Sequence, residues 1–266
     1  MAITAYFYQL LIHLKKNKII DTNQTKSIFE IGEQNWYGDV KIEDLLTSAK
    51  DLSEENSKKE IVSRLEEILL DIKTNNSQKK PTFELAKIFY RIIFNHEKYS
   101  AIDLHGTEHS IKFNLNEEFK TEEQYDVVTN IGTTEHIFNQ YNVFKTIHNL
   151  TKPDGLIFHQ IPGQGYYDHG FYNYQPTFFF DLALANDYSI IGFWIYDNNK
   201  IEVIKIHTRD NYQKLFTRDN HPTYYDNVVV FKKSSIPGKE FNLPTQFIYS
   251  DKVNLEDLSN WDKNKK

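Results

Sequence analysis

The chain contains no cysteine, so its 266 residues offer no disulfide, no thiolate metal site and no cysteine nucleophile. It also lacks an excess of basic residues: the formal net charge is −6, which disfavours the basic stripe that duplex nucleic acid requires. Charged residues follow the first apolar stretch rather than precede it, and that stretch is too short to span a bilayer. We therefore expect a cytoplasmic protein that has no membrane span and binds no nucleic acid.

The apolar residues that are present, 39% of the chain, are enough for a large core. Their three- and four-residue spacing predicts an N-terminal helix and, after a short strand at residues 27–32, a long helical region. That region comprises "KIEDLLTSAKDL", "SKKEIVSRLEEILLDI" and "PTFELAKIFYRIIFNHEKY", with Pro81 at the first helical position of the third helix. The polar segment "KTNNSQKK" between the last two reads as a mobile loop.

Short apolar runs then follow at regular intervals and predict further strands. They are "YSAIDL", "IKFNL", "YDVVTNI", "GLIFHQI", "SIIGFWIY" and "YYDNVVVFKK". Two helices, "TEHIFNQYNVFKTIHNL" and "PTFFFDLALAND", lie between them. Nearly continuous apolar strands are buried on both faces, as in a parallel sheet, so we predict an open α/β sheet.

Polar side chains follow four of the predicted strands, where ligands of such a sheet bind. The glycine of "FEIGEQ" lets a ligand approach the backbone, although a plain turn explains it equally well. Asp103 in "AIDLHG" can accept both hydroxyls of a ribose, or cap a turn. Asn114 or Asn116 in "KFNLNEEF" can pair with an adenine edge, or close an Asx-turn. In "NIGTTEHIFNQ", Thr133 or Thr134 is expected to cap the next helix.

Together these segments resemble the class I S-adenosylmethionine-dependent methyltransferases. "FEIGEQ" stands at the glycine-rich first motif, "AIDLHG" at the acidic residue that holds the ribose, and "FNLN" at the adenine site. "YDVVTNIGTTEH" and "LTKPDGLIFHQIP" match the fourth strand and the approach to the fifth. The resemblance covers roughly residues 27–233. The first motif has fewer glycines than the family's, because Glu33 and Gln34 replace them.

The resemblance implies a single Rossmann-like methyltransferase domain over residues 1–266. Its sheet is expected to be mostly parallel with an antiparallel last strand, with helices on both faces and a helical insertion over residues 40–98. This insertion is expected to be a lid or an acceptor wall, with a packing element or a homodimer surface as the alternatives. S-adenosylmethionine is the implied cofactor, and its implied contacts are Glu30, Gly32, Gln34, Asp103, Leu104, Asn114, Leu115, Asn130, Gly132 and Thr133.

Within the family, "GTTEHIFNQ" and "HQIPGQGYYDHGFYNYQP" resemble methyltransferases of bacterial surface-polysaccharide gene clusters. This implies a small-molecule acceptor methylated on oxygen, such as a nucleotide-linked sugar or a phosphoramidate precursor of capsule. The amino-methyltransferase pattern Asn/Asp-Pro-Pro-aromatic is missing after the fourth strand, where "NIGTT" stands.

Methyl transfer to a hydroxyl needs a proton acceptor, and histidine suits neutral pH. His169 is the first candidate for this base and His136 the second, with Glu135 beside it; a solvated helix residue and a dipole-compensating carboxylate are the structural alternatives. Tyr and Phe can stack on sugar faces. The expected acceptor contacts are His159, Tyr167, Asp168, Asn173 and Tyr174, although His159 also fits a core histidine that a neighbour satisfies.

Two other classes of function remain open at this point. One is a metal-dependent hydrolase, but the chain has no HExxH motif or other tight ligand spacing, so no metal site is predicted. A magnesium-assisted methyltransferase stays possible. The other class is a non-catalytic partner that keeps the methyltransferase fold. Calorimetry with S-adenosylmethionine would separate these readings.

Overall fold

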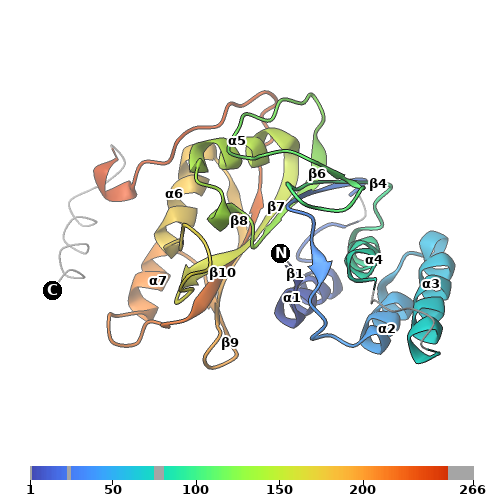
Figure 1. The fold of residues 1–266 in the computed structure, drawn as a ribbon. Coiled ribbons are helices and arrows are strands. Elements are labelled where there is room, and N and C mark those ends of the chain that lie inside the picture. Colours follow the sequence, from blue (N-terminus) through green and yellow to red (C-terminus); the bar gives the residue numbers. More distant parts are fainter. Residues whose placement is uncertain (1, 23–24, 75–80, 251–266) are drawn as a thin grey trace. The chain divides into compact units, whose positions relative to one another are not determined.

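The computed structural model describes residues 2–22, 25–74 and 81–250, and the chain divides into two compact units (Figure 1). The first unit is Met1–Phe113 and the second is Asn114–Lys266. Each unit has its own parallel strands and its own helices. Within the described ranges, no helix combines the length and the apolar character needed to cross a membrane.

The first unit contains three parallel strands, with β4 (Lys98–Ile102) between β2 (Ser27–Ile31) and β5 (Ser110–Ile111). All five residues of β2 are buried, and its three apolar residues, Ile28, Phe29 and Ile31, fit a strand that is covered on both faces. Two further short strands, β1 (Ala2–Ile3) and β3 (Asn35–Trp36), pair in parallel with each other.

Four helices complete the first unit: α1 (Ala5–Lys16), α2 (Ile42–Leu52), α3 (Glu55–Lys73) and α4 (Thr82–Phe94). They confirm the helices predicted from the apolar spacing. Pro81 is the N-cap residue of α4 rather than its first helical residue. Residues 75–80 of the predicted mobile loop lie outside the described residues. The role of the helical region as a lid or an acceptor wall stays a prediction.

The second unit contains two parallel strands, β6 (Tyr125–Ile131) and β7 (Thr151–Gln164). The last strand of the sheet in chain order, β10 (Tyr225–Lys232), is antiparallel both to β7 and to β8 (Ser189–Asp197). Together with the parallel strands of the first unit, this confirms the predicted mostly parallel arrangement with an antiparallel last strand. An unpredicted strand, β9 (Glu202–Ile206), pairs with β8; only one of its five residues is buried, so it left no apolar run to recognise.

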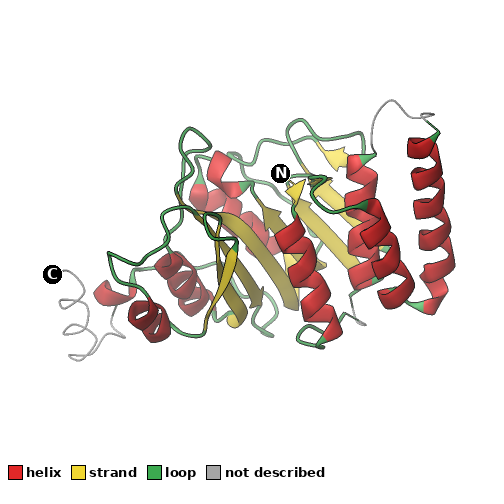
Figure 2. Cartoon of the chain, turned by 90° about the horizontal axis from the view of Figure 1, so that it is seen from below, coloured by secondary structure: helices red, strands yellow, loops and turns green. Residues whose placement is uncertain are grey.

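Helices connect the strands of the second unit, and Figure 2 distinguishes the two kinds of element by colour. α5 (Gln140–Leu150) joins β6 to β7, and α6 (Pro176–Asn186) joins β7 to β8. A short helix, α7 (Arg209–Leu215), follows β9 and has no buried residue. Two single turns of 3₁₀-helix lie at Thr134–His136 and Phe247–Tyr249.

The segment after β6 departs from the predicted continuous helix. A 3₁₀ turn comes first, and α5 begins only at Gln140, so the prediction of one helix over residues 134–150 is wrong. The predicted threonine cap is also wrong: Thr133 makes no capping hydrogen bond, and Asn139 caps α5 by accepting from the Asn142 amide at 3.1 Å. Asn130 is the cause, because its side chain accepts from the Thr134 amide and donates to the Thr134 hydroxyl.

The predicted strand "IKFNL" is confirmed only at its first residue. β5 ends at Ile111, and the chain turns at Asn114, whose Oδ1 accepts from the Asn116 amide at 3.1 Å. This is an Asx-turn, in which a side chain replaces the strand's backbone partner. The turn leads the chain out of the first unit and into the second.

Candidate functional site

The loop after β2 in the first unit is built by two buried polar side chains, Glu30 and Gln34. Glu30 Oε2 accepts from the Tyr99 hydroxyl at 2.5 Å and from the Gln34 amide at 2.9 Å. The Gln34 side chain donates to the Gly32 carbonyl at 2.6 Å and accepts from the Tyr90 hydroxyl. Gly32 has a φ of 77°, where a side chain would be strained. These bonds shape a tight turn, although the glycine-rich pattern is incomplete.

Glu33, the other residue that replaces a family glycine, ties this turn to the loop after β4. Its carboxylate accepts from the Thr107 amide at 2.5 Å and the Thr107 hydroxyl at 2.7 Å, and it lies 3.1 Å from the Lys87 ammonium. Burial raises the pKa of Glu33, but the bonds from Thr107 and Lys87 outweigh it and lower the pKa below its usual value. Glu33 is therefore an ionised, paired carboxylate.

Asp103 lies directly after β4 and is half-buried. Its two carboxylate oxygens accept from the amides of Glu33 at 3.1 Å and His105 at 2.8 Å. An ionised carboxylate has about four acceptor positions, so two remain for a ligand such as a ribose diol. The next residue, Leu104, is 54% exposed and offers an apolar surface beside the carboxylate.

Glu30 should make the stability of the protein depend on pH. Burial raises its pKa to about 8, and its Oε1 has no hydrogen-bond partner among the described residues. Because the folded-state pKa lies above the usual value of 4.5, the folded form holds this proton more tightly, and stability falls as the pH rises between these two values. The variant Glu30→Gln, a neutral isostere, is therefore expected to melt above the wild type at pH 9.

The same comparison at pH 4 provides the control, because both side chains are then neutral and the difference should largely vanish. Other titrating groups cancel in the difference between the two proteins. Melting temperatures measured across this pH range test the expectation. A difference that does not change with pH would mean that Glu30 is not held in the protonated form.

In the second unit, the predicted adenine contacts lie at its first residues. Asn114 is half-buried, and its Oδ1 is engaged in the Asx-turn. Leu115 is buried, and its carbonyl accepts from the Asn142 side chain at 2.9 Å. Asn116 accepts from the Asn139 amide at 3.0 Å. This turn is thereby fixed to the start of α5.

The most distinctive arrangement of the second unit is a cluster of Glu135, His136 and His169, called the Glu–His–His cluster below. Glu135 Oε1 lies 3.8 Å from His136 Nε2 and 3.6 Å from His169 Nε2. The two imidazole rings are 5.0 Å apart between centroids. Glu135 is fully buried, whereas the histidine side chains are 43% and 44% exposed. Two of the predicted catalytic residues thus come from the turn after β6 and the third from the loop after β7.

Backbone contacts hold the loop after β7 against Glu135. The Glu135 carbonyl accepts from the amide of Phe171 at 2.8 Å and from that of Tyr172 at 3.3 Å. A Cβ atom at Gly170 would stand 2.9 Å from the same carbonyl oxygen and 3.1 Å from Glu135 Cγ, so only glycine fits without a shift. Gly132 turns the chain with a φ of 67°. Gly170 and Phe171, which directly follow His169, therefore hold His169 close to Glu135.

The buried carboxylate at the centre of the cluster has an unusual environment. Neither oxygen of Glu135 has a hydrogen-bond partner among the described residues. Burial raises the pKa of Glu135 to about 7, and the charge of Asp226 adds to the rise. Burial and the neighbouring His169 lower the pKa of His136. Perturbed titratable groups that converge from two strand ends are typical of functional sites.

The remaining predicted residues of this unit fall into two groups. Tyr167, Asp168 and Asn173 are exposed on the loop after β7, and Tyr167 is 92% exposed. Asn130, Thr133 and Tyr174 are buried.

His159 is only 1% exposed, and burial lowers its pKa to about 3. Its Nδ1 lies 2.9 Å from the Asn130 side-chain amide, and aromatic rings surround it. His159 therefore matches the structural alternative, a core histidine satisfied by a neighbour. As it lies, it presents no surface to an acceptor.

Two features beside the cluster were not predicted. Phe138 and Phe171 are 70% and 67% exposed, and their rings meet edge to face at 6.0 Å. Tyr166 packs against His169 at 5.3 Å and donates to Asp226, a buried aspartate at the start of β10, at 2.7 Å. The many aromatic residues of the loop were the sequence signal for the exposed rings. No local pattern in the sequence links Asp226 to a tyrosine 60 residues earlier.

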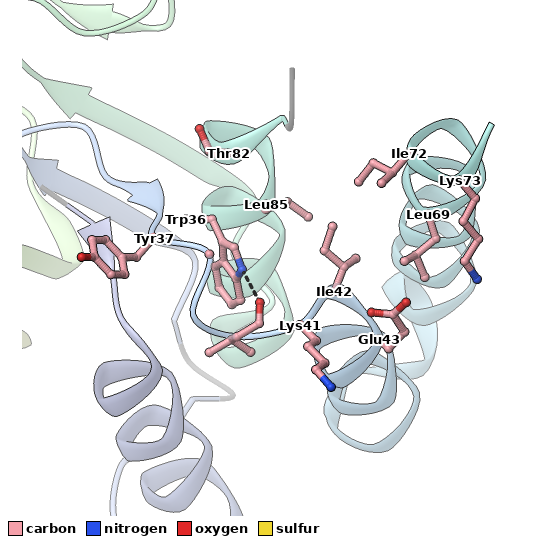
Figure 3. Close-up of a pocket in the computed structure, with 12 residues that line it drawn as sticks. Trp36, Tyr37, Lys41, Ile42, Glu43, Leu69, Ile72, Lys73, Thr82 and Leu85 are labelled. Carbon is pink, nitrogen blue, oxygen red and sulfur yellow. Dashed lines mark hydrogen bonds between the residues drawn. The ribbon is translucent and has the colours of Figure 1, made fainter. Parts of the chain in front are cut away.

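A cavity of 370 Å³ lies elsewhere, within the first unit (Figure 3). Its apolar wall includes Ile42 of α2, Leu69 and Ile72 of α3 and Leu85 of α4. The Trp36 indole donates to the Val40 carbonyl at 3.1 Å at its edge. None of the predicted cofactor, catalytic or acceptor residues lines this cavity.

Comparison with known proteins identifies a family. Residues 59–220, more than half of the chain, match the family described as "Methyltransferase domain". No curated protein matches the chain.

Solved structures with a similar fold include a candidate methyltransferase from Bacillus halodurans, at 9% identity and a TM-score of 0.44, covering 86% of this chain and 100% of that one. An O-methyltransferase from a Brevibacillus brevis multienzyme, bound to S-adenosylhomocysteine, has 10% identity and a TM-score of 0.40 over 85% and 72% of the chains. Coclaurine N-methyltransferase, bound to N-methylheliamine and S-adenosylhomocysteine, has 13% identity and a TM-score of 0.38 over 87% and 74%. At such low scores the assignment rests on the family match.

Proposed function

The chain belongs to the family of methyltransferase domains, and on this premise we propose that it transfers a methyl group from S-adenosylmethionine to an oxygen atom of a small polar acceptor. The observation that carries the choice of site is the Glu–His–His cluster. It lies where the acceptor side of such a sheet is expected, after two parallel strands. The absence of an Asn/Asp-Pro-Pro-aromatic motif after β6 supports oxygen rather than nitrogen as the methylated atom.

In this reaction the acceptor oxygen attacks the methyl carbon in line with the sulfur. The new C–O bond forms as the C–S bond breaks, and its electron pair neutralises the sulfonium to give S-adenosylhomocysteine. The hydroxyl proton must leave the acceptor, which an imidazole can assist. His169 is the first candidate for this proton acceptor and His136 the second, and buried Glu135 fixes their surroundings. Holding the reactants in line is the other contribution that the protein makes.

For the cofactor, we propose contacts in each unit. In the first unit they are Glu30, Gly32, Gln34, Asp103 and Leu104, with Asp103 accepting from the ribose hydroxyls through its remaining acceptor positions. In the second unit they are Asn114, Leu115, Asn130, Gly132 and Thr133. The buried members of these sets act by shaping the turns that approach the cofactor.

For the acceptor, we propose a cytoplasmic precursor of capsule or another surface polysaccharide, of the nucleotide-sugar, sugar or phosphoramidate type. The exposed rings of Tyr167, Phe138 and Phe171 support this choice, because aromatic faces stack on sugars while nearby polar groups bind hydroxyls. Asp168 and Asn173 on the same loop supply such polar groups. The loop sequence also resembles those of polysaccharide-cluster methyltransferases.

Incubation with S-adenosylmethionine and a panel of nucleotide-linked sugars and phosphoramidates tests the proposal. The expected result is an acceptor heavier by one methylene group in mass spectrometry, together with one equivalent of S-adenosylhomocysteine. Cofactor binding in calorimetry without methylation of any acceptor in the panel would favour a non-catalytic partner that keeps the fold. Absence of cofactor binding would contradict the proposal outright.

A further inference from the structure

We propose that Glu135, His136 and His169 together bind one divalent transition-metal cation, of which Zn²⁺ is the best probe, and that this ion activates the acceptor oxygen. The claim that the ion activates the acceptor oxygen rests on the proposed function, whereas the claim that the cluster binds a metal ion does not. Within the described residues these three side chains form a group whose potential ligand atoms all lie within 4.8 Å of one another.

The distances suit a shared ion better than they suit hydrogen bonds. Two ligands about 2.1 Å from a tetrahedral ion stand about 3.4 Å apart. The distances from Glu135 Oε1 to the two Nε2 atoms, 3.8 and 3.6 Å, are close to this spacing. They are too long for hydrogen bonds, so the side chains face one another without bonding. A small contraction around a central ion would bring all three into contact with it.

The carboxylate at the centre needs such a partner. Glu135 is fully buried, and neither oxygen is paired within the described part of the chain. An unpaired carboxylate in an apolar setting is costly, whereas a bound cation compensates it. Asp226, an acid close enough to act on Glu135, is already hydrogen-bonded to Tyr166 and adds repulsion rather than relief.

The backbone holds the three ligands in place before any ion binds. His169 is adjacent to Gly170, which packs directly on Glu135, and the Phe171 amide bonds the Glu135 carbonyl. His136 is next to Glu135 in the 3₁₀ turn. Rigid placement of ligands from two separate segments is what a metal site requires. Because both histidines are partly exposed, an ion there would keep an open position on the solvent side.

The donor set selects the class of ion. One carboxylate oxygen and two imidazole nitrogens suit first-row transition dications, and His₂Glu with an open position is an established zinc arrangement. Mg²⁺ and Ca²⁺ prefer oxygen donors throughout. An acceptor hydroxyl bound at the open position of the ion would have a lowered pKa, so that it loses its proton to solvent before it attacks the methyl group.

The test is metal binding by the full chain, without cofactor or acceptor. After treatment with a chelator and dialysis, the protein is titrated with Zn²⁺ and with Mg²⁺ by calorimetry, and bound zinc is counted by elemental analysis. We expect one equivalent of Zn²⁺ and no binding of Mg²⁺. When Co²⁺ is bound in place of Zn²⁺, the protein should show the visible absorption bands of a four- or five-coordinate site.

Three variants and a control locate the ion. Glu135→Gln, His136→Ala and His169→Ala should each weaken Zn²⁺ binding by at least about 100-fold, since even indirect support of a ligand is worth 10–100-fold. His207→Ala, which removes an exposed imidazole elsewhere in the unit, should bind as the wild type does. His136 and His169 are partly exposed, so their variants should fold even if Glu135→Gln does not.

Wild-type protein that takes up no zinc, or histidine variants that bind it as tightly as the wild type, would overturn the inference. If the protein then still transfers the methyl group in the presence of a chelator, the proposed function stands and a histidine acts as the base. Conversely, tight zinc binding at the cluster in a protein that methylates no acceptor would uphold the metal site and count against the proposed function.

Discussion

Replacing His169 by alanine is expected to lower the turnover of methyl transfer by roughly 10²–10⁴-fold, because it removes either the proton acceptor or a ligand of the ion that replaces it. The side chain is 44% exposed, so its loss should leave the melting temperature almost unchanged. Turnover at saturating cofactor and acceptor, measured by the release of S-adenosylhomocysteine, tests this expectation. His207→Ala serves as the matched control and should keep full turnover.

His136→Ala separates the two explanations. If an ion activates the acceptor, both histidine variants lose turnover to a similar degree, and a chelator inactivates the wild type. If one histidine is a simple base, only that variant fails and the chelator has no effect. Should both variants keep turnover within a factor of a few at neutral pH, the cluster does not activate the acceptor at all. An acceptor that is already ionised would then be the natural candidate.

The α/β architecture could be predicted from the sequence because buried strands leave a strong signal. Residues 125–131, for example, surround two valines with a tyrosine and an isoleucine and form β6 over those same positions, with six of the seven residues buried. Exposed elements left no such signal, which is why β9 and α7 were missed. The end of β5 was misjudged because Asn114 closes a turn that competes with the strand.

The candidate site could be predicted only in part. Proximity to β6 was enough to single out Glu135 and His136, since strand ends are where ligands bind. Their meeting with His169 depends on contacts between distant segments, chiefly Gly170 packing on Glu135, and no local pattern encodes that. The prediction of a threonine cap failed for a related reason. The Asn130 side chain accepts from the Thr134 amide in the turn where a threonine was expected to act as the cap.

Asp103→Ala should weaken binding of S-adenosylhomocysteine by about ten- to a hundredfold. The proposed bonds from ribose hydroxyls to an ionised carboxylate contribute about 1.5–3 kcal/mol, and each 1.4 kcal/mol corresponds to about tenfold in affinity. The same carboxylate accepts from the amides of Glu33 and His105, so some loss of stability is expected as well. Titration calorimetry measures the affinity, and thermal melting measures the stability.

Asp103→Asn distinguishes these two effects, because it keeps an oxygen for one of the backbone amides but removes the charge. It should melt closer to the wild type than Asp103→Ala does, yet bind S-adenosylhomocysteine weakly. Glu108→Gln changes an exposed acid on the same loop and should alter neither quantity. If both Asp103 variants bind as the wild type does while their melting temperatures fall, Asp103 serves only to hold the turn after β4. The ribose would then need another acceptor.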